Sequence, residues 1–280
     1  MEFDPLNDFL FLKIMGEEGD EKQCLAFLNA VLASKSKRPV TLIKILENKT
    51  FTAEVIDDKT NILDVRVETD TGEKINIEVQ LRDLKNIEKR TLFHWGREYT
   101  SSLSSGKNYN VLPRVITINI VDFDYIKLEE FHTCFHLWED DHPGYLLTDV
   151  LEVHFISMVK FRKLKTGDIA NNALERWLTF LDRHTPEEVI EEVVKMDNAI
   201  NMAYEQLKHV TQDKEFLRAY HRREMAMSDW TTGIDTAMEK GIEIGKIEVA
   251  KSMLNEGMSI EVICRVTGLD AEMIKSLMQN

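Results

Sequence analysis

Two carboxylates in the segment 63–80 have the residue types and the spacing of a metal-binding pair. Apolar and polar residues alternate on both sides of residues 70–72, and this period of two predicts two β-strands. Gly72 can take the positive φ that ends a three-residue hairpin loop. A hairpin centred on the middle residue of that loop sets Asp64 directly opposite Glu78.

The register of this hairpin is fixed by its apolar face. A slip of one residue would turn polar side chains into the core. The expected apolar pairs are Val67 with Ile75, Val65 with Ile77, and Leu63 with Val79. The expected polar pairs are Glu68 with Lys74, Arg66 with Asn76, and Asp64 with Glu78, and Gln80 follows on the same face.

Facing carboxylates need a positive neighbour. Cβ atoms of directly opposed residues lie ~5 Å apart, so Asp64 and Glu78 repel each other unless a cation lies between them. A divalent metal ion would meet this need. A solvent-exposed polar face, with Arg66 or a nearby lysine neutralising the pair, is the alternative at this point.

The basic residues gather around the same hairpin. The whole chain has a formal charge of −14, which argues against nonspecific attraction to nucleic acid. Residues 74–114 instead carry an excess of four positive charges, eight against four. The eight are Lys74, Arg82, Lys85, Lys89, Arg90, Arg97, Lys107 and Arg114, and the four are Glu78, Asp83, Glu88 and Glu98. A site that cleaves a phosphodiester needs such a positive segment, although an ordinary solvated face also tolerates one.

The composition is that of a globular protein. A chain of 280 residues with 43% hydrophobic content can bury one main domain and an appendage. No apolar run approaches the ~20 residues needed to cross a bilayer, and the N-terminal segment is acidic, so we expect a cytoplasmic protein without a membrane partner. Cys24, Cys134 and Cys264 are widely spaced, which predicts buried reduced thiols.

The elements around the hairpin predict an α/β fold with a mixed sheet. Asp4 and Pro5 should cap and start a helix that ends at Gly16. The further expected elements are a helix over 20–32, a weak strand signal over 40–56, a helix over 85–103, a strand over 115–123 and two strands within 130–160.

Beyond residue 167 the pattern is helical. Thr185 is expected to cap a helix with Pro186 at its first position and Glu188 completing a capping box. Small residues then recur every four positions and permit close helix pairing: Gly233, Ala237, Gly241 and Gly245. Two short helices over 259–278 form a helix-turn-helix pattern, and the scarcity of basic residues there favours dimerisation or packing over reading a DNA groove.

Other chemistry-bearing side chains have a structural explanation. Trp95 and Tyr99 could stack on a base, but core packing is the commoner use of such a pair. His132, Cys134 and His136 share one strand face and could mimic a zinc site. No fourth ligand is near them in the sequence, so we expect no site there.

Several stretches together resemble the bacterial Rpn family of recombination-promoting nucleases, also described as transposases of the PD-(D/E)XK nuclease superfamily. They are "DPLNDFLFLKIMG", "NILDVRVETDTGEKINIEVQ", "HWGREYTSSLSSGKNYNVLPRVITINIVDF", "LEVHFI" and "GKIEVAKSMLNEGMSIEVICRVTGL". The resemblance spans nearly the whole chain. It implies a restriction-endonuclease-like αβββαβ core followed by a helical C-terminal region, and a Mg²⁺-dependent DNA endonuclease acting near mobile elements or in recombination.

The resemblance also assigns residues. Asp64 matches the first metal-binding aspartate and Glu78 the second acid, while Asp8 corresponds to an additional acid that some members carry. Leu63 stands in place of the proline of the motif, which does no chemistry. Gln80 stands in place of the lysine, so it can orient a water molecule but supplies neither a proton nor a cation. Tyr109 falls at a position that the family favours, and we assign it to packing.

These inferences combine into one hypothesis and one alternative. Asp64, Glu78 and the Val79 carbonyl would hold Mg²⁺, for which Mn²⁺ can substitute, with Gln80 positioning the water. The residues expected to contact DNA phosphates are Lys13, Arg82, Lys85 and Lys89. The expected division is a nuclease-like core over 1–165, a helical extension over 166–228 and a helix-turn-helix-like appendage over 229–280 that forms a homodimer. The alternative is a catalytically impaired nuclease fold that binds DNA or protein.

Overall fold

A computed structural model describes residues 3–17, 19, 21–33, 39–46, 64–103, 106, 108–164 and 168–278. The chain divides into two compact units, residues 1–220 and residues 221–280. The first unit holds the sheet and most of the helices. None of the described helices is long and apolar enough to cross a membrane.

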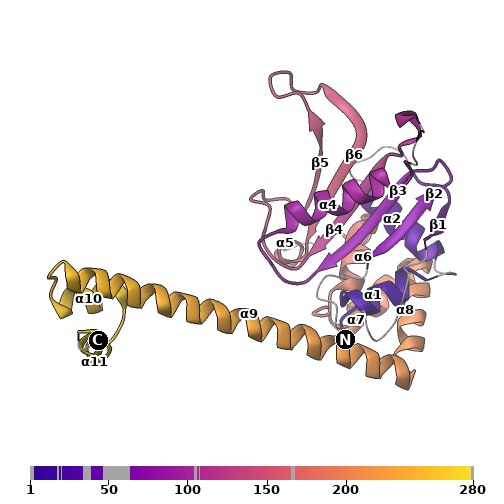
Figure 1. The fold of residues 1–280 in the computed structure, drawn as a ribbon. Coiled ribbons are helices and arrows are strands. Elements are labelled where there is room, and N and C mark those ends of the chain that lie inside the picture. The colour runs from indigo at the N-terminus through magenta and orange to yellow at the C-terminus, as the bar shows by residue number, and fades with distance from the viewer. Residues whose placement is uncertain are drawn as a thin grey trace. The chain divides into compact units, whose positions relative to one another are not determined.

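The first unit is built on a mixed sheet, as the sequence predicts (Figure 1). Within the described residues its strand order is β1-β2-β3-β4-β6-β5. The strands are β1 (Ile43–Ile45), β2 (Val65–Thr69), β3 (Lys74–Gln80), β4 (Val115–Val121), β5 (His132–Trp138) and β6 (Leu146–Ser157). β3, β4 and β6 run parallel, and the remaining pairs are antiparallel. The weak strand signal over 40–56 corresponds to β1 in its first part, and residues 47–56 lie outside the described residues.

The hairpin of β2 and β3 has the predicted register. Val65 pairs with Ile77 and Arg66 with Asn76. The loop closes through Thr69, whose backbone N–H donates to the Glu73 carbonyl at 2.9 Å. Gly72 has the expected positive φ, at 81°. The predicted pairing of Leu63 lies outside the described residues.

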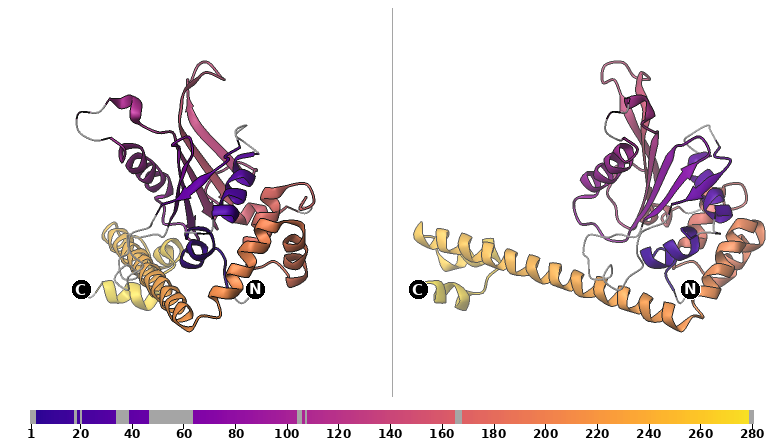
Figure 2. Two further views of the ribbon diagram at one scale, coloured as in Figure 1. Left: turned by 90° about the vertical axis from the view of Figure 1, so that its right-hand side faces the viewer. Right: turned by 45° about the vertical axis from the view of Figure 1, so that its right-hand side comes forward.

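Helices cover both faces of the sheet (Figure 2). Residues of α1 (Asp8–Met15), α2 (Glu21–Ala33), α6 (Ala173–Leu181), α7 (Glu187–Met196) and α8 (Asn198–Val210) share one hydrophobic core with Val65, Val67, Ile75, Ile77 and Val79. The helix α4 (Ile87–Thr100) lies on the other face, where a smaller cluster contains Ile87, Val121, Val153 and Phe155. Because side chains alternate along a strand, the odd-numbered residues of β3 enter the large core and the even-numbered ones face α4.

Short elements join these parts. The 3₁₀ helix η1 (Tyr109–Val111) precedes β4, and α5 (Met158–Phe161) follows β6 directly. The two strands expected within 130–160 are confirmed as β5 and β6. Cys24 is buried, whereas Cys134 and Cys264 are partly exposed, so the expectation of three buried thiols holds for one of them.

Two predicted helix caps are wrong, and both errors have a local cause. α1 begins at Asp8 because the Asn7 side chain caps it, accepting hydrogen bonds from the backbone of Phe9 and Leu10. The Asp4 side chain instead accepts from the Leu6 N–H. α7 begins at Glu187 without a side-chain cap, because the Thr185 hydroxyl donates to the Thr179 carbonyl.

The second unit is helical. A long helix, α9 (Lys214–Asn255), begins in the first unit and continues through the second, where α10 (Ile260–Thr267) and α11 (Ala271–Leu277) follow. Ala250, Ile263 and Ile274 form their core. The predicted helix-turn-helix pattern is confirmed as two short helices, with Gly268 ending the first at φ 69° and Asp270 capping the second. The division at residues 165 and 228 stays a prediction.

Alanine substitution should have opposite effects on stability at Gly72, in the hairpin loop, and at Gly96, in α4. Gly72→Ala should destabilise the protein by ~1–2 kcal/mol, because an L-residue is strained at positive φ. Gly96→Ala should stabilise it by ~1 kcal/mol, because Gly96 lies inside α4 and an added Cβ would meet no atom within 4 Å. Urea denaturation measures both, and a neutral Gly72→Ala would contradict the assigned loop.

Candidate active site

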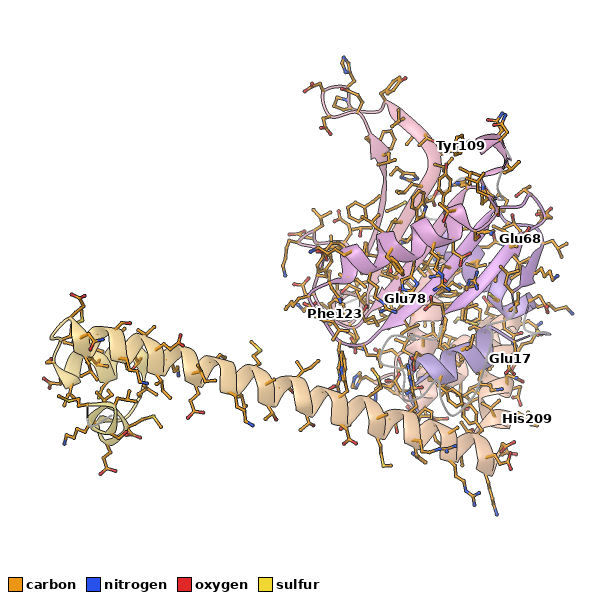
Figure 3. All side chains as sticks on the ribbon, in the orientation of Figure 1. Glu17, Glu68, Glu78, Tyr109, Phe123 and His209 are labelled. Carbon is orange, nitrogen blue, oxygen red and sulfur yellow. The ribbon has the colours of Figure 1, made fainter. Side chains whose placement is uncertain are left out.

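The polar face of the β2–β3 hairpin is buried beneath α4. Glu78 is fully buried, and Asp64, Asn76 and Gln80 are each less than a tenth exposed. Figure 3 labels Glu78 on the face of the sheet that α4 covers. The alternative of a solvent-exposed polar face is therefore wrong, and the acid pair must be satisfied inside the protein.

The two carboxylates share a small set of polar neighbours. The Arg90 guanidinium donates from Nε to Oε1 of Glu78. Oδ2 of Asp64 accepts a hydrogen bond from the Asn76 side-chain amide at 3.4 Å, and Nδ1 of His94 lies 3.4 Å from the same oxygen. Arg66, which the sequence offered as a neutralising residue, pairs instead with Glu98 at 2.6 Å. Arg90 is thus a cation in direct contact with Glu78.

Burial and repulsion set the protonation of this site. Burial, followed by the charge of Glu78, raises the pKa of Asp64 to about 8, against a smaller lowering by Arg90 and Asn76. Burial also lowers the pKa of His94. The charge of Glu78 opposes this shift, and the charge of Arg90 adds to it. Near neutral pH the metal-free site therefore holds a protonated Asp64 and a neutral His94 imidazole, which can act as a ligand.

The donor atoms fit a divalent cation. Ligand atoms of Asp64, Glu78 and His94 all lie within 4.8 Å of one another. Three further buried oxygens have no hydrogen-bond partner among the described residues: Oε2 of Glu78, Oε1 of Gln80 and Oδ1 of Asn76. Buried acceptors are normally satisfied. A cation with its bound water molecules would satisfy these oxygens and ionise Asp64.

α4 is anchored so that its polar residues reach the hairpin. The Thr91 hydroxyl donates to the Asn119 side chain at 2.8 Å, and the Trp95 indole N–H donates to the Val115 carbonyl at 3.2 Å. Trp95 also stacks on Tyr99, with ring centroids 4.8 Å apart, which is the packing use expected of them.

Arg90 and His94 are site residues that the sequence did not identify. They lie four positions apart on α4 and face the sheet together with Glu98. The spacing of 90, 94 and 98 was a usable signal, because residues four apart lie on one helix face. A charged stripe of this kind is commonly solvated, so its burial could not be read without the sheet.

The predicted site residues on the β3–α4 connection lie beside this pair. The Gln80 amide N–H donates to the Arg82 carbonyl at 2.8 Å, which orients the side chain at the end of β3. Arg82, Lys85 and Lys89 are all exposed. Lys85 has a φ of 58° and pairs with Asp83 at 2.5 Å.

The remaining predicted residues are placed elsewhere. The Val79 side chain enters the large core, so only its backbone lies between Glu78 and Gln80. Lys13 on α1 pairs with Glu17, which lies just beyond the end of that helix. Asp8 begins α1, where its side chain accepts from the Phe9 N–H. Tyr109 is 75% exposed, so its assignment to packing is wrong.

Comparison with known families gives two matches that together cover most of the chain. Residues 5–237 match the PD-(D/E)XK nuclease family transposase. Residues 244–279 match the Rpn/YhgA-like nuclease family, C-terminal HTH domain. No curated protein and no solved structure matches the chain. The first match contains the hairpin, α4 and every residue of the candidate site.

Removing the titratable carboxyl group of Asp64 should change how stability depends on pH. The folded-state pKa of about 8 lies above the ordinary value, so the native state holds an extra proton between roughly pH 4 and 8. The free energy of unfolding therefore falls as pH rises through this window, by up to ~1.4 kcal/mol per unit. In EDTA, Asp64→Asn should lose this slope and gain stability over the native protein from pH 5 to 8, as measured by urea denaturation.

The exposed hairpin residue Asp70 provides the control. Asp70→Asn makes the same substitution at an exposed position in the loop and should keep the native slope. Parallel stability profiles for the native protein and Asp64→Asn would show that Asp64 ionises normally.

Truncating Arg90 should leave Glu78 as an uncompensated buried charge. Arg90→Met is expected to destabilise the metal-free protein by ~3–5 kcal/mol, because removing one partner of a buried ion pair is costly. Mn²⁺ should recover a large part of this loss by taking the place of the guanidinium charge. Thermal unfolding with and without Mn²⁺ measures both effects. Lys89→Met, an exposed change one position away on the same helix, should have little effect, and an equal loss there would contradict the assignment.

Proposed function

The chain belongs to the PD-(D/E)XK nuclease family transposases, and from that premise we propose that it is a metal-dependent DNA endonuclease. The reaction is hydrolysis of phosphodiester bonds in DNA, in association with recombination or mobile elements. One observation carries the proposal: Asp64 and Glu78 are buried side by side, with their donor atoms and that of His94 within 4.8 Å. We place the activity in the cytoplasm.

Mg²⁺ is the proposed cofactor, and Mn²⁺ should substitute for it. Asp64, Glu78 and the Val79 carbonyl would hold the ion, with His94 as a nitrogen ligand beside Asp64. Carboxylate and carbonyl oxygens suit both Mg²⁺ and Mn²⁺. When bound, the ion would lower the pKa of a water molecule and stabilise charge on the phosphoryl group.

Gln80 and Arg90 would together take the role of the lysine that stands at this position in the PD-(D/E)XK superfamily motif. The Gln80 amide N–H donates to the Arg82 carbonyl, so Oε1 of Gln80 would accept a hydrogen bond from the attacking water. The Arg90 guanidinium beside Glu78 provides the positive charge that glutamine lacks. Its Nη2 is buried without a hydrogen-bond partner among the described residues, so it keeps a donor for a phosphate oxygen.

DNA would approach along the basic connection that leads into α4. Arg82, Lys85 and Lys89 are exposed there, next to the catalytic strand, and would contact phosphates. For Lys13, which pairs with Glu17, phosphate binding stays a prediction, as does the additional acidic role of Asp8.

The C-terminal unit would add DNA binding and pairing of two chains. The HTH domain match favours contact with DNA by α10 and α11 over the packing role alone. The glycine-striped part of α9 also presents apolar side chains four positions apart, Ile234, Met238 and Ile242, each more than a third exposed. Small and apolar residues on one helix suit a homodimer contact.

A second candidate function is a nuclease fold that binds DNA or protein without cutting it. The observation in its favour is that Arg90 already neutralises Glu78, while Gln80 cannot supply a cation. In this case the buried pair is a structural ion cluster and needs no metal.

Cleavage of supercoiled plasmid distinguishes the two candidates. Native protein should nick the plasmid with Mg²⁺ or Mn²⁺ and not with EDTA. Asp64→Ala and Glu78→Ala should each lower the rate at least ~10²-fold, since the ion loses a ligand. Arg90→Lys should keep more activity than Arg90→Met.

The matched control is Asp70→Ala, which removes an exposed acid from the hairpin loop. It should cleave at the native rate, and circular dichroism should show that all variants are folded. Equal cleavage by the native protein and the two acid variants, or no cleavage by folded native protein with either metal, would favour the binding function.

A further inference from the structure

A second cluster of ligand-type side chains lies on β5 and β6. The sequence placed His132, Cys134 and His136 on one strand face without a further ligand nearby. The structure corrects this, because β6 pairs with β5 and sets His154 opposite Cys134. Glu152, two residues before His154, joins the same face.

This cluster lies on the opposite side of the sheet from the Asp64–Glu78 pair. In β6, Val153 and Phe155 belong to the small hydrophobic cluster on the α4 side, whereas Ile156 belongs to the large core on the other side. Alternation along the strand therefore turns Glu152 and His154 away from α4. The two clusters share no residue and can be tested separately.

The distances suit a small metal ion. Sγ of Cys134 lies 3.8 Å from Nδ1 of His136, whose Nε2 lies 3.2 Å from Oε2 of Glu152. Ligand atoms of these three residues all lie within 4.8 Å of one another. Adjacent ligands of a tetrahedral zinc ion are separated by roughly 3.3–3.6 Å, given its bond lengths to sulfur, nitrogen and oxygen. These two distances involve different nitrogens of the His136 ring, and one ion binds only one of them, so side-chain movement at His136 is needed to bring Sγ and Oε2 around the same nitrogen.

The neighbours of the cluster are arranged to support its ligands. His154 approaches Oε1 of Glu152 with Nε2 at 2.6 Å, while its Nδ1 lies 2.9 Å from Nε2 of His132. Arg114 pairs with Oε2 of Glu152 and with Glu73. Partners of this kind fix the orientation of metal-binding side chains.

Charge and access are also compatible with a dication. A Cys134 thiolate, Glu152, Glu73 and Arg114 would carry a combined formal charge of −2, which a divalent ion would balance. Glu152 and His154 are buried, whereas Cys134 and His136 are partly exposed and open a route from solvent. A thiolate, an imidazole and a carboxylate select zinc over Mg²⁺.

We propose that Cys134, His136 and Glu152 form a zinc site, with His154 and Arg114 as its supporting neighbours. Three protein ligands leave a fourth position for water. The site is independent of the proposed nuclease centre, and its loss need not impair that centre.

Metal binding by the full chain tests this proposal. After incubation with ZnCl₂ and dialysis, the native protein should retain about one equivalent of zinc, and so should Glu78→Ala. The Co²⁺-loaded protein should show a thiolate-to-cobalt charge-transfer band. Cys134→Ser should lose that band, and Cys134→Ser and His136→Ala should each bind zinc at least ~10-fold more weakly. Cys264→Ser, a change at another partly exposed cysteine, should behave as native.

A measurement on the native protein alone covers the case in which a variant fails to fold. ZnCl₂ should slow alkylation of Cys134 by iodoacetamide and leave the rate at Cys264 unchanged, as followed by mass spectrometry. Equal alkylation of Cys134 with and without zinc, or a cobalt-loaded protein without a thiolate band, would overturn the proposal.

Discussion

Asp64 and Glu78 are held side by side in the interior, and two ionised carboxylates cannot remain there without a cation. Burial and mutual repulsion raise the pKa of Asp64 to about 8, even with Arg90 in contact with Glu78. The site therefore has two ways to be neutralised. It can keep a proton on Asp64 beside Arg90, or it can release that proton and bind a divalent ion. Binding of metal and ionisation of Asp64 are thus one coupled event.

The rest of the fold serves to create that pair. The hairpin register, continued one residue before β2, sets the two acids opposite each other. The apolar residues on the other face of the strands keep the register by packing in one core with α1 and α2. α4 then closes over the acids and supplies Arg90 and His94. The same alternation of side chains turns the ligand cluster of β5 and β6 to the opposite face, so one sheet carries two separate sites.

The features that could be predicted from the sequence are those set by residues close together in the chain. The register of β2 and β3 followed from alternating residues and one glycine. The end of α10 followed from Gly268, and the start of α11 followed from Asp270. The predicted starts of α1 and α7 were wrong because Asn7 caps α1 in place of Asp4, and because α7 has no side-chain cap. Asn7 and the Thr185–Thr179 hydrogen bond decided the outcome.

What depends on contacts between distant segments could not be predicted. Arg90 looked like any other basic residue of an exposed helix until α4 was placed over β3. Glu152 and His154 lie on β6, whereas Cys134 lies on β5. The cluster could therefore be recognised only once the pairing of β5 with β6 was known. The exposure of Tyr109 likewise depends on where η1 lies in the fold.

Anomalous scattering from crystals of the full chain grown with Mn²⁺ tests the central claim most directly. The coupled proton and metal site predicts a manganese peak among Asp64, Glu78 and His94, with the Glu78 carboxylate bound to the ion. Ordered density for these side chains with no manganese among them, and with Arg90 still bound to Glu78 at saturating Mn²⁺, would contradict it and leave the pair as a structural ion cluster.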